Sequence, residues 1–364
     1  MAQVRLRSIL LPALLLVLAL SWGAGAGLAE SKGVGKGRGE ISFQRALGKP
    51  KAKRVTPRRS IRWGALIHEQ INGEQVPWDM GAAHWLERAL GKEMSLIHFM
   101  APFSDCSDKD DCFHYEFPAR EMQTIRNHGA TPFFSWSSQS IPSGEVQPDY
   151  QLSDVISGRY DGFIRQWARD AKEWGKPFFL RFNWEMNGEW FPWHEGVNGN
   201  QPGEYVRAWR HVHDIFDSIG ATNPIWVWCP NVDFEGSLRD LSSVYPGHSY
   251  VEWTCLDGYN SGTNPNKKDR WRTFDQLYER TYREIVEEIA PAKPMVIGEI
   301  ASTEHGGSKA QWIAETLQVV PRDYPKIRGL VWFDKIERSV DWPIETSPSA
   351  LAAFAAGIAR PIYR

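Results

Sequence analysis

The sequence predicts a single (β/α)₈ barrel, the TIM-barrel architecture, preceded by an N-terminal leader. Eight short apolar segments alternate with longer amphipathic segments over roughly 300 residues, as one such barrel requires. Most of the short segments are continuous apolar runs, which is typical of parallel strands covered by helices. The alternative is a doubly wound open sheet, but no Gly-rich dinucleotide fingerprint follows the first strand.

The expected strands and helices follow in order along the chain. The strands are residues 62–67, 95–100, 132–136, 177–183, 225–229, 254–259, 294–299 and 329–334. Apolar residues recur at three- and four-residue spacing over 160–171, 205–219 and 274–289, so each of these segments predicts a helix with one buried face. Because no interdomain linker or internal repeat interrupts the pattern, we expect one domain over 61–364.

The first 60 residues differ in composition from the rest. Residues 1–29 predict a cleaved secretory signal peptide, because Arg5 and Arg7 precede an apolar run and a small-residue cleavage site. The run is shorter than the ~20 residues that span a bilayer; an uncleaved anchor is the alternative. Residues 30–60 predict a flexible, disordered basic arm, either a spacer or a tether to an anionic surface. We expect a secreted or periplasmic protein.

Charge and hydropathy exclude two further classes of protein. The 364 residues include 42 Lys and Arg and 44 Asp and Glu, a formal charge of −2. Residues 1–60 carry +10, so residues 61–364 carry −12. An acidic body argues against nucleic-acid binding. After the leader no stretch is apolar enough for a membrane helix, and we expect no membrane span.

Export would permit disulfide bonds. Cys106 and Cys112 bracket an acidic loop and predict a local disulfide. The aspartates of this loop could bind Ca²⁺, but we favour a solvated loop. Cys229 and Cys255 lie in apolar strand segments, and we expect unreactive core thiols there.

Polar residues at the carboxyl ends of the strands are the candidate catalytic residues, because the active sites of such barrels lie there. Side chains alternate along a strand, so we expect Arg181, Asn183 and Glu185 to point to one side at the end of the fourth strand. Glu299 ends the seventh strand, on the opposite wall of the barrel. The two glutamates should therefore face each other across the pocket.

Two facing carboxyl groups suggest hydrolysis of a glycosidic bond, with one group protonated and the other ionised. A single Glu could merely pair with an Arg at a strand end, so the prediction depends on both. Aromatic residues, on which flat sugar faces can stack, crowd the same strand ends. They are Trp136, Trp190, Phe191, Trp193, Tyr259 and Trp332.

Residues 181–193 resemble the acid/base motif of glycoside hydrolase family 26, the β-mannanase family; they read RFNWEMNGEWFPW. Other matches, in the family's order, are VWCPN at 227–231, YPG at 245–247, DGYN at 257–260, VIGEI at 296–300 and DW at 341–342. The resemblance implies a retaining enzyme with Glu185 as acid/base and Glu299 as nucleophile. It also implies that Tyr259 lies near the nucleophile and that Trp332 is a sugar platform.

A retaining mechanism predicts carboxyl groups about 5–5.5 Å apart. We expect desolvation and the second carboxylate to raise the pKa of Glu185. Family members usually have His before the acid/base, where this chain has Trp184, and this difference concerns mannan specificity more than catalysis. The family also includes mixed-linkage β-glucanases and β-1,3-xylanases.

We therefore expect a monomeric hydrolase of β-linked polysaccharide, β-1,4-mannan or a related β-glucan, that needs no cofactor and no metal. The expected substrate contacts are Arg181, Asn183, Trp136, Trp190, Trp193, Tyr259 and Trp332. The alternative is a barrel that binds polysaccharide without cleaving it, against which the intact Glu pair counts. A metal-dependent hydrolase finds little support, because His211 and His213 are two residues apart on a helix and point different ways.

Overall fold

The computed structural model describes residues 59–364 apart from 109–111, 235–239, 265–268 and 338–339. The expected signal peptide and all but the last two residues of the basic arm lie outside the described residues. Among the residues described, no helix combines the length and apolar character needed to cross a membrane.

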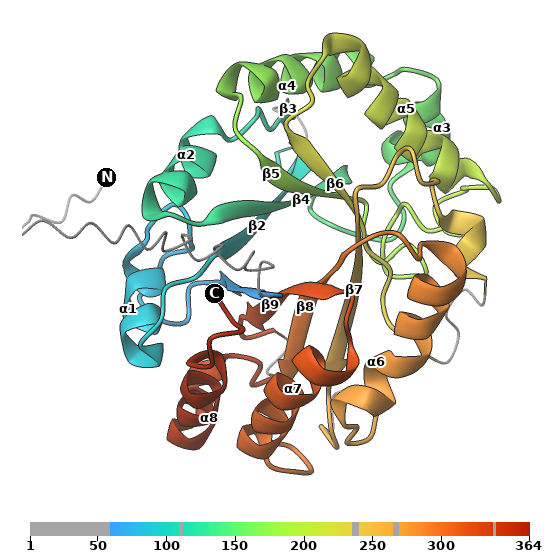
Figure 1. Cartoon of the computed structure of the whole chain (residues 1–364). Coiled ribbons are helices and arrows are strands. Elements are labelled where there is room, and N and C mark those ends of the chain that lie inside the picture. The colour runs from blue at the N-terminus through green and yellow to red at the C-terminus, as the bar shows by residue number, and fades with distance from the viewer. Residues whose placement is uncertain (1–58, 109–111, 235–239, 265–268, 338–339) are drawn as a thin grey trace, which may run out of the picture. The chain divides into compact units, whose positions relative to one another are not determined.

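Eight parallel strands close into a barrel (Figure 1). They are β1 (Arg62–Ile67), β2 (Leu96–Asp105), β4 (Thr131–Ile141), β5 (Phe178–Phe182), β6 (Pro224–Trp228), β7 (Trp253–Asn260), β8 (Met295–Ser302) and β9 (Ile327–Asp334). The barrel closes where β9 pairs with β1, from Gly329 opposite Arg62 to Asp334 opposite Ile67. A short strand, β3 (Phe113–His114), pairs antiparallel with the end of β2. The predicted (β/α)₈ fold is confirmed, with the eight expected strands in the expected order.

Helices surround the barrel (Figure 1). They are α1 (Gly81–Leu90), α2 (Ala119–His128), α3 (Leu152–Ile156), α4 (Asp161–Trp174), α5 (Glu204–Ile219), α6 (Phe274–Arg283), α7 (Lys309–Asp323) and α8 (Pro348–Ile358). A π-helical segment, Glu284–Ile289, continues α6, and 3₁₀ turns form at Pro148–Tyr150, Leu241–Val244 and Ile344–Thr346. The three predicted amphipathic segments correspond to α4, α5 and α6 with its continuation.

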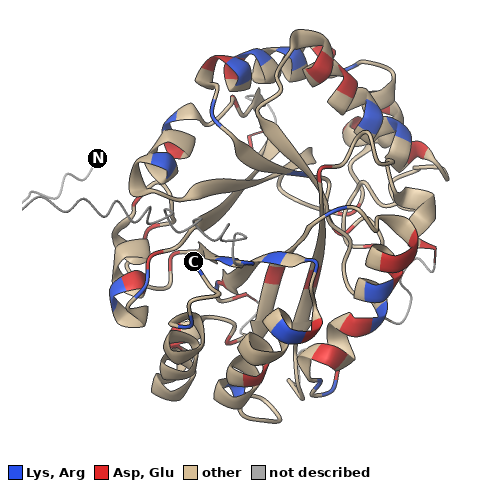
Figure 2. Ribbon diagram, in the orientation of Figure 1, with Lys and Arg blue, Asp and Glu red and all other residues tan. Residues whose placement is uncertain are grey.

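The helices bury one apolar face against the strands. On α4 the buried residues include Ile164, Trp167 and Ala171, at the three- and four-residue spacing of one helix face. Gly220 ends α5 with a φ of 73°, a left-handed conformation that glycine adopts without steric cost. Charged residues gather on these outer helices, whereas the strands are largely uncharged (Figure 2). The few charged side chains inside the barrel therefore need a separate explanation.

Two disulfides join the four cysteines. Cys106 pairs with Cys112 across the acidic loop. Cys229 pairs with Cys255, so our expectation of core thiols at these positions is wrong. The reason is the register of β6 and β7, which sets Trp228 opposite Thr254 and thereby places the next two residues, both cysteines, side by side.

Candidate active site

Arg181, on β5, lies fully buried in the barrel and contacts side chains of β4, β7 and β8. Its guanidinium donates to Asp257 Oδ2 on β7 at 2.5 Å and to Ser135 Oγ on β4 at 2.7 Å. It also donates to Glu299 Oε1 on β8. A buried charge needs ionic or hydrogen-bonded partners, and these contacts supply them. Arg181 thus holds the carboxylates of Asp257 and Glu299 in position. Because it is fully buried, it has no exposed surface for the substrate contact that we expected.

Glu299 lies on β8, three residues before the strand ends, and is almost fully buried. One carboxylate oxygen accepts from Arg181, and the other accepts from the hydroxyl of Tyr259 on β7. Burial, followed by the nearby carboxylates, raises the pKa of Tyr259 well above its usual value, so this phenol keeps its proton and acts as a donor. Two donors, one of them cationic, stabilise a charged carboxylate at this position.

Gly298 provides the space that this arrangement needs. A Cβ atom at this position would lie 2.5 Å from Sγ of Cys255 and 2.8 Å from Oδ1 of Asp257. It would also lie 3.1 Å from Nη1 of Arg181. All of these atoms belong to buried groups held by other contacts, so none can move away freely.

We expect Gly298→Ala to lower the free energy of unfolding by about 1–3 kcal/mol, because overpacking a rigid interior forces strain. Gly144→Ala is the matched control, since a Cβ there meets nothing within 4 Å. Thermal unfolding of both variants measures the effect. Equal melting temperatures for the two variants would contradict the packing described here.

Glu185 does not lie on a strand. β5 ends at Phe182, and the chain then turns with φ values of 42° at Asn183 and 52° at Glu185. The strand alternation that we used to orient these two residues therefore stops before them. The backbone N–H of Glu185 donates to the carbonyl of Cys229 at 2.7 Å, which anchors the turn to the end of β6. Left-handed conformations of non-glycine residues are costly and concentrate at functional sites.

The turn brings the Glu185 carboxyl group to the other acidic residues. One oxygen each of Glu185, Asp257 and Glu299 lies within 4.8 Å of the other two. Glu185 accepts from Nε1 of Trp190 at 2.8 Å and from Nδ2 of Asn231 at 2.6 Å. Burial, together with the negative charge of Glu299, raises the pKa of Glu185 to about 7, the direction that we expected. The site thus holds one carboxyl group whose surroundings favour the protonated form beside another that receives two donors.

Three carboxylates this close could in principle bind a cation. Here the guanidinium of Arg181 already contacts Asp257 and Glu299 and supplies the positive charge between them. A second cluster of possible metal ligands consists of Cys229, Cys255 and Asp257. Its two sulfur atoms are joined in a disulfide, so the cluster lacks the thiolates that bind metals. We assign no metal to either group.

Two of the expected sugar platforms lie on the wrong face of their strands. Trp136 is fully buried and stacks on Trp167 of α4, with ring centroids 4.4 Å apart. Trp332 is buried against Trp312 of α7 and Phe354 of α8. Side chains alternate along a strand, and the adjacent residues Ser135 and Phe333 point into the barrel, so both tryptophan rings point outward. Trp136 and Trp332 are therefore packing residues of the barrel wall, and our expectation of substrate contact was wrong for both.

Asn183 and Trp193 are also fully buried. The side-chain amide of Asn183 accepts from the backbone N–H of Ser138 at 2.9 Å and donates to its hydroxyl at 2.8 Å, which ties the turn to β4. Trp193 donates to the carbonyl of Trp184 at 2.7 Å. Both residues support the loop that carries Glu185. Of the residues expected to contact substrate, Trp190 is 37% exposed and Tyr259 is partly buried.

Sequence reasoning gave no site role to three further residues, although each lies in one of the family matches. Asn231 contacts Glu185, Asp257 pairs with Arg181, and Trp342 packs on Tyr259 with centroids 5.3 Å apart. Asp257 lies three residues before the end of β7, as Glu299 does on β8, and Asn231 follows the end of β6 by three residues, so position near a strand end could have identified both. Trp342 follows β9 by eight residues, and no strand-end signal marks it.

Two carboxyl groups facing each other at the strand ends of a barrel form the arrangement that glycoside hydrolysis uses. Residues 100–313 match Glycosyl hydrolase family 26, and the chain belongs to this family. It is 40% identical over 234 residues to Endoglucanase H of Acetivibrio thermocellus, covering 63% of this chain and 24% of that protein. It is 28% identical over 225 residues to Mannan endo-1,4-beta-mannosidase A and B of Caldalkalibacillus mannanilyticus, covering 60% and 36%. The chain thus spans well under half the length of either relative.

Solved structures share the fold. The mannanase man26 of Bacillus subtilis superposes with a TM-score of 0.55 and 16% identity, over 81% of this chain and 85% of that one. A double mutant of an endo-beta-1,4-mannanase from Cellulomonas fimi gives a TM-score of 0.59 and 19% identity, over 84% and 72%. At this level of identity the likeness concerns the barrel alone.

Proposed function

We propose that this protein hydrolyses a β-linked polysaccharide, β-1,4-mannan or a related β-glucan, by double displacement with retention of configuration. The observation that supports this best is the Glu185 and Glu299 pair, with an oxygen of each within 4.8 Å of the other. Retaining enzymes have carboxyl groups about 5–5.5 Å apart, whereas inverting enzymes leave room for water at roughly 6.5–9.5 Å. A short separation favours direct attack by a carboxylate.

Unequal environments assign the two roles. Glu299, which receives donors from Arg181 and Tyr259, attacks the anomeric carbon as the nucleophile. Glu185, whose pKa is raised to about 7, gives its proton to the leaving glycosidic oxygen. The bond to the leaving group breaks as the glycosyl ester to Glu299 forms. Glu185, now ionised, then removes a proton from water, which attacks the ester and releases the sugar.

The surroundings of the pair and the names of the relatives support this choice of substrate. Trp190 donates to Glu185 and is partly exposed, so it can also touch a bound sugar. The matched relatives are named for endoglucanase and mannan endo-1,4-beta-mannosidase activity.

We propose that the protein is secreted or periplasmic, because such polymers lie outside the cell. Residues 1–29 direct export, residues 30–60 form a basic arm and residues 61–364 form the catalytic barrel.

A panel of polysaccharides tests the proposal. Mannan, glucomannan, mixed-linkage β-glucan, cellulose and β-1,3-xylan are each incubated with the protein, and new reducing ends are counted. We expect release from at least one of them, and chromatography of the product lengths separates endo from exo action. Tight binding without release from any member would instead favour a non-catalytic polysaccharide-binding barrel.

The pH dependence of kcat/KM tests the role of Glu185. Because this residue must be protonated in the first step, kcat/KM should fall as the pH rises through about 7. The hydrogen bond from Trp190 lowers the pKa of Glu185, so Trp190→Phe should move this alkaline limb to higher pH. Trp174→Phe, on the outer helix α4, is the control and should leave the limb in place. An alkaline limb that ignores Trp190→Phe would assign the titration to another group.

A further inference from the structure

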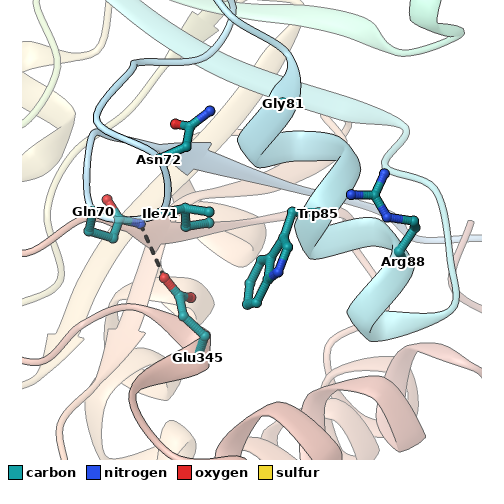
Figure 3. Close-up of a pocket in the computed structure, with 7 residues that line it drawn as sticks. All are labelled: Gln70, Ile71, Asn72, Gly81, Trp85, Arg88 and Glu345. Atoms are coloured by element: carbon teal, nitrogen blue, oxygen red, sulfur yellow. Dashed lines mark hydrogen bonds between the residues drawn. The ribbon is translucent and has the colours of Figure 1, made fainter. Parts of the chain in front are cut away.

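A pocket of about 490 Å³ lies at the edge of the barrel, and the catalytic pair is not part of its lining (Figure 3). Its walls come from three segments: the loop after β1, helix α1 and the 3₁₀ turn Ile344–Thr346 after β9. The lining residues are Gln70, Ile71, Asn72, Gly81, Trp85, Arg88 and Glu345. Because two of these segments follow the carboxyl ends of strands, the pocket belongs to the same end of the barrel as Glu299.

Trp85 gives the pocket an aromatic wall. The indole is 39% exposed, whereas the tryptophans of the barrel wall are fully buried. Gly81 precedes it by one helical turn on α1 and carries no side chain. Figure 3 shows the ring extending from α1 into the opening, toward Ile71 and Glu345. Leaving an indole face in water is unfavourable, and a flat ligand that stacks on it would remove that cost.

Polar side chains line the pocket around this ring. Nε2 of Gln70 donates to the carbonyl of Asp334 at 2.6 Å and to Oε1 of Glu345 at 3.4 Å. The same Nε2 donates to Oδ2 of Asp334 at 3.2 Å, so Gln70 and Glu345 are held in place beside this buried carboxyl group. Oδ1 of Asn72 accepts from the backbone of Glu74, which leaves its amide N–H groups as donors. Exposed amide N–H groups beside an aromatic ring favour a ligand that brings hydroxyl or ether oxygens as acceptors.

Charge narrows the choice of ligand further. Arg88 and Glu345 lie on opposite sides of the opening, so the pocket offers one cation and one anion (Figure 3). Such a lining gives no strong preference for an anionic group such as phosphate. An exposed aromatic face, amide and carboxylate groups and no net charge together fit a neutral, hydroxyl-rich ring.

We propose that this pocket binds a sugar unit of the polysaccharide chain, away from the bond that is cleaved. Two adjacent residues of β9 connect this pocket to the catalytic pair. Gln70 hydrogen-bonds Asp334, and the preceding residue, Phe333, packs against Tyr259 with centroids 5.5 Å apart. Tyr259 in turn donates to Glu299. The inference rests on the proposed function, because it takes its ligand from the same polymer.

Trp85→Ala tests the proposal on the full chain. With Glu299→Ala present to prevent hydrolysis, affinity electrophoresis in gels containing each polysaccharide of the panel measures binding. We expect Trp85→Ala to weaken binding by about tenfold and Trp85→Phe, which keeps a ring, to weaken it less. Trp174→Ala on α4 should bind as the parent does. Thermal unfolding verifies that each variant is folded.

In the active enzyme, the ratio of kcat/KM on the long polymer to that on its shortest cleaved oligosaccharide should fall about tenfold in Trp85→Ala. Equal gel mobility and an unchanged ratio in folded Trp85→Ala would overturn the inference while leaving hydrolysis established. If no polymer is hydrolysed but binding still depends on Trp85, the pocket stands and the proposed function fails. If no polymer is bound or cleaved, both fail.

Discussion

Replacing Glu299 by Ala is expected to reduce turnover of the polysaccharide by at least about four orders of magnitude, because the reaction loses its covalent nucleophile. Arg181 keeps its contacts to Asp257 and Ser135, so we expect the barrel to remain folded. Glu299→Gln provides a second variant that retains the shape and the oxygen acceptor. The loss is measured by reducing-end release, and thermal unfolding separates it from a loss of fold.

Azide distinguishes a lost nucleophile from a disturbed site. In Glu299→Ala the truncated side chain leaves room for this small anion beside Arg181 and Tyr259. We expect azide to restore cleavage of an activated aryl glycoside and to give the glycosyl azide of inverted configuration. Full activity of folded Glu299→Ala without azide would rule out Glu299 as the nucleophile.

Replacing Glu185 by Gln is expected to slow hydrolysis of the polysaccharide by about 10²–10⁴-fold, because the leaving oxygen then departs without a proton. Nδ2 of Asn231 and Nε1 of Trp190 both donate to the carboxyl group at present. The amide of Gln can accept from only one side, so Glu185→Ala serves as a second variant. The leaving group should decide the size of the effect.

A dinitrophenyl glycoside needs no protonation, so Glu185→Gln should form the glycosyl-enzyme from it at nearly the parental rate and then stall. Stopped-flow measurement should therefore show a burst of dinitrophenol. Glu189→Gln is the matched control, since Glu189 lies in the same loop but is exposed. The acid role would be refuted by equal losses on the aryl glycoside and the polymer.

The barrel and Glu299 could be predicted because they depend on local pattern. Continuous apolar runs between amphipathic segments defined the strands of a parallel barrel, and Glu299 lies within β8, where the predicted strand had placed it. Glu185 was identified as one of the pair, although the alternation argument for it was wrong. The positive φ values at Asn183 and Glu185 depend on contacts with β4 and β6, which no local pattern encodes.

Errors about the aromatic residues have the same origin. Trp136 ended a predicted strand and Trp332 lay near the end of another. Because side chains alternate, a shift of one residue moves a side chain from the interior to the helix-facing side, and the predicted strand bounds did not establish which residues point inward. Ser135 contacts Arg181, so the next residue must point outward. The disulfide of Cys229 and Cys255 likewise depends on the register between β6 and β7, which the sequence does not specify.

The stereochemistry of the first product tests the central claim most directly. Proton NMR can follow hydrolysis of an oligosaccharide of the β-linked polymer that the enzyme cleaves, before the released sugar mutarotates. With Glu299 attacking and Glu185 protonating, the new reducing end should appear first as the β anomer and convert to the equilibrium mixture later. Initial formation of the α anomer would mean direct attack by water and would contradict the assignment of Glu299 as a nucleophile.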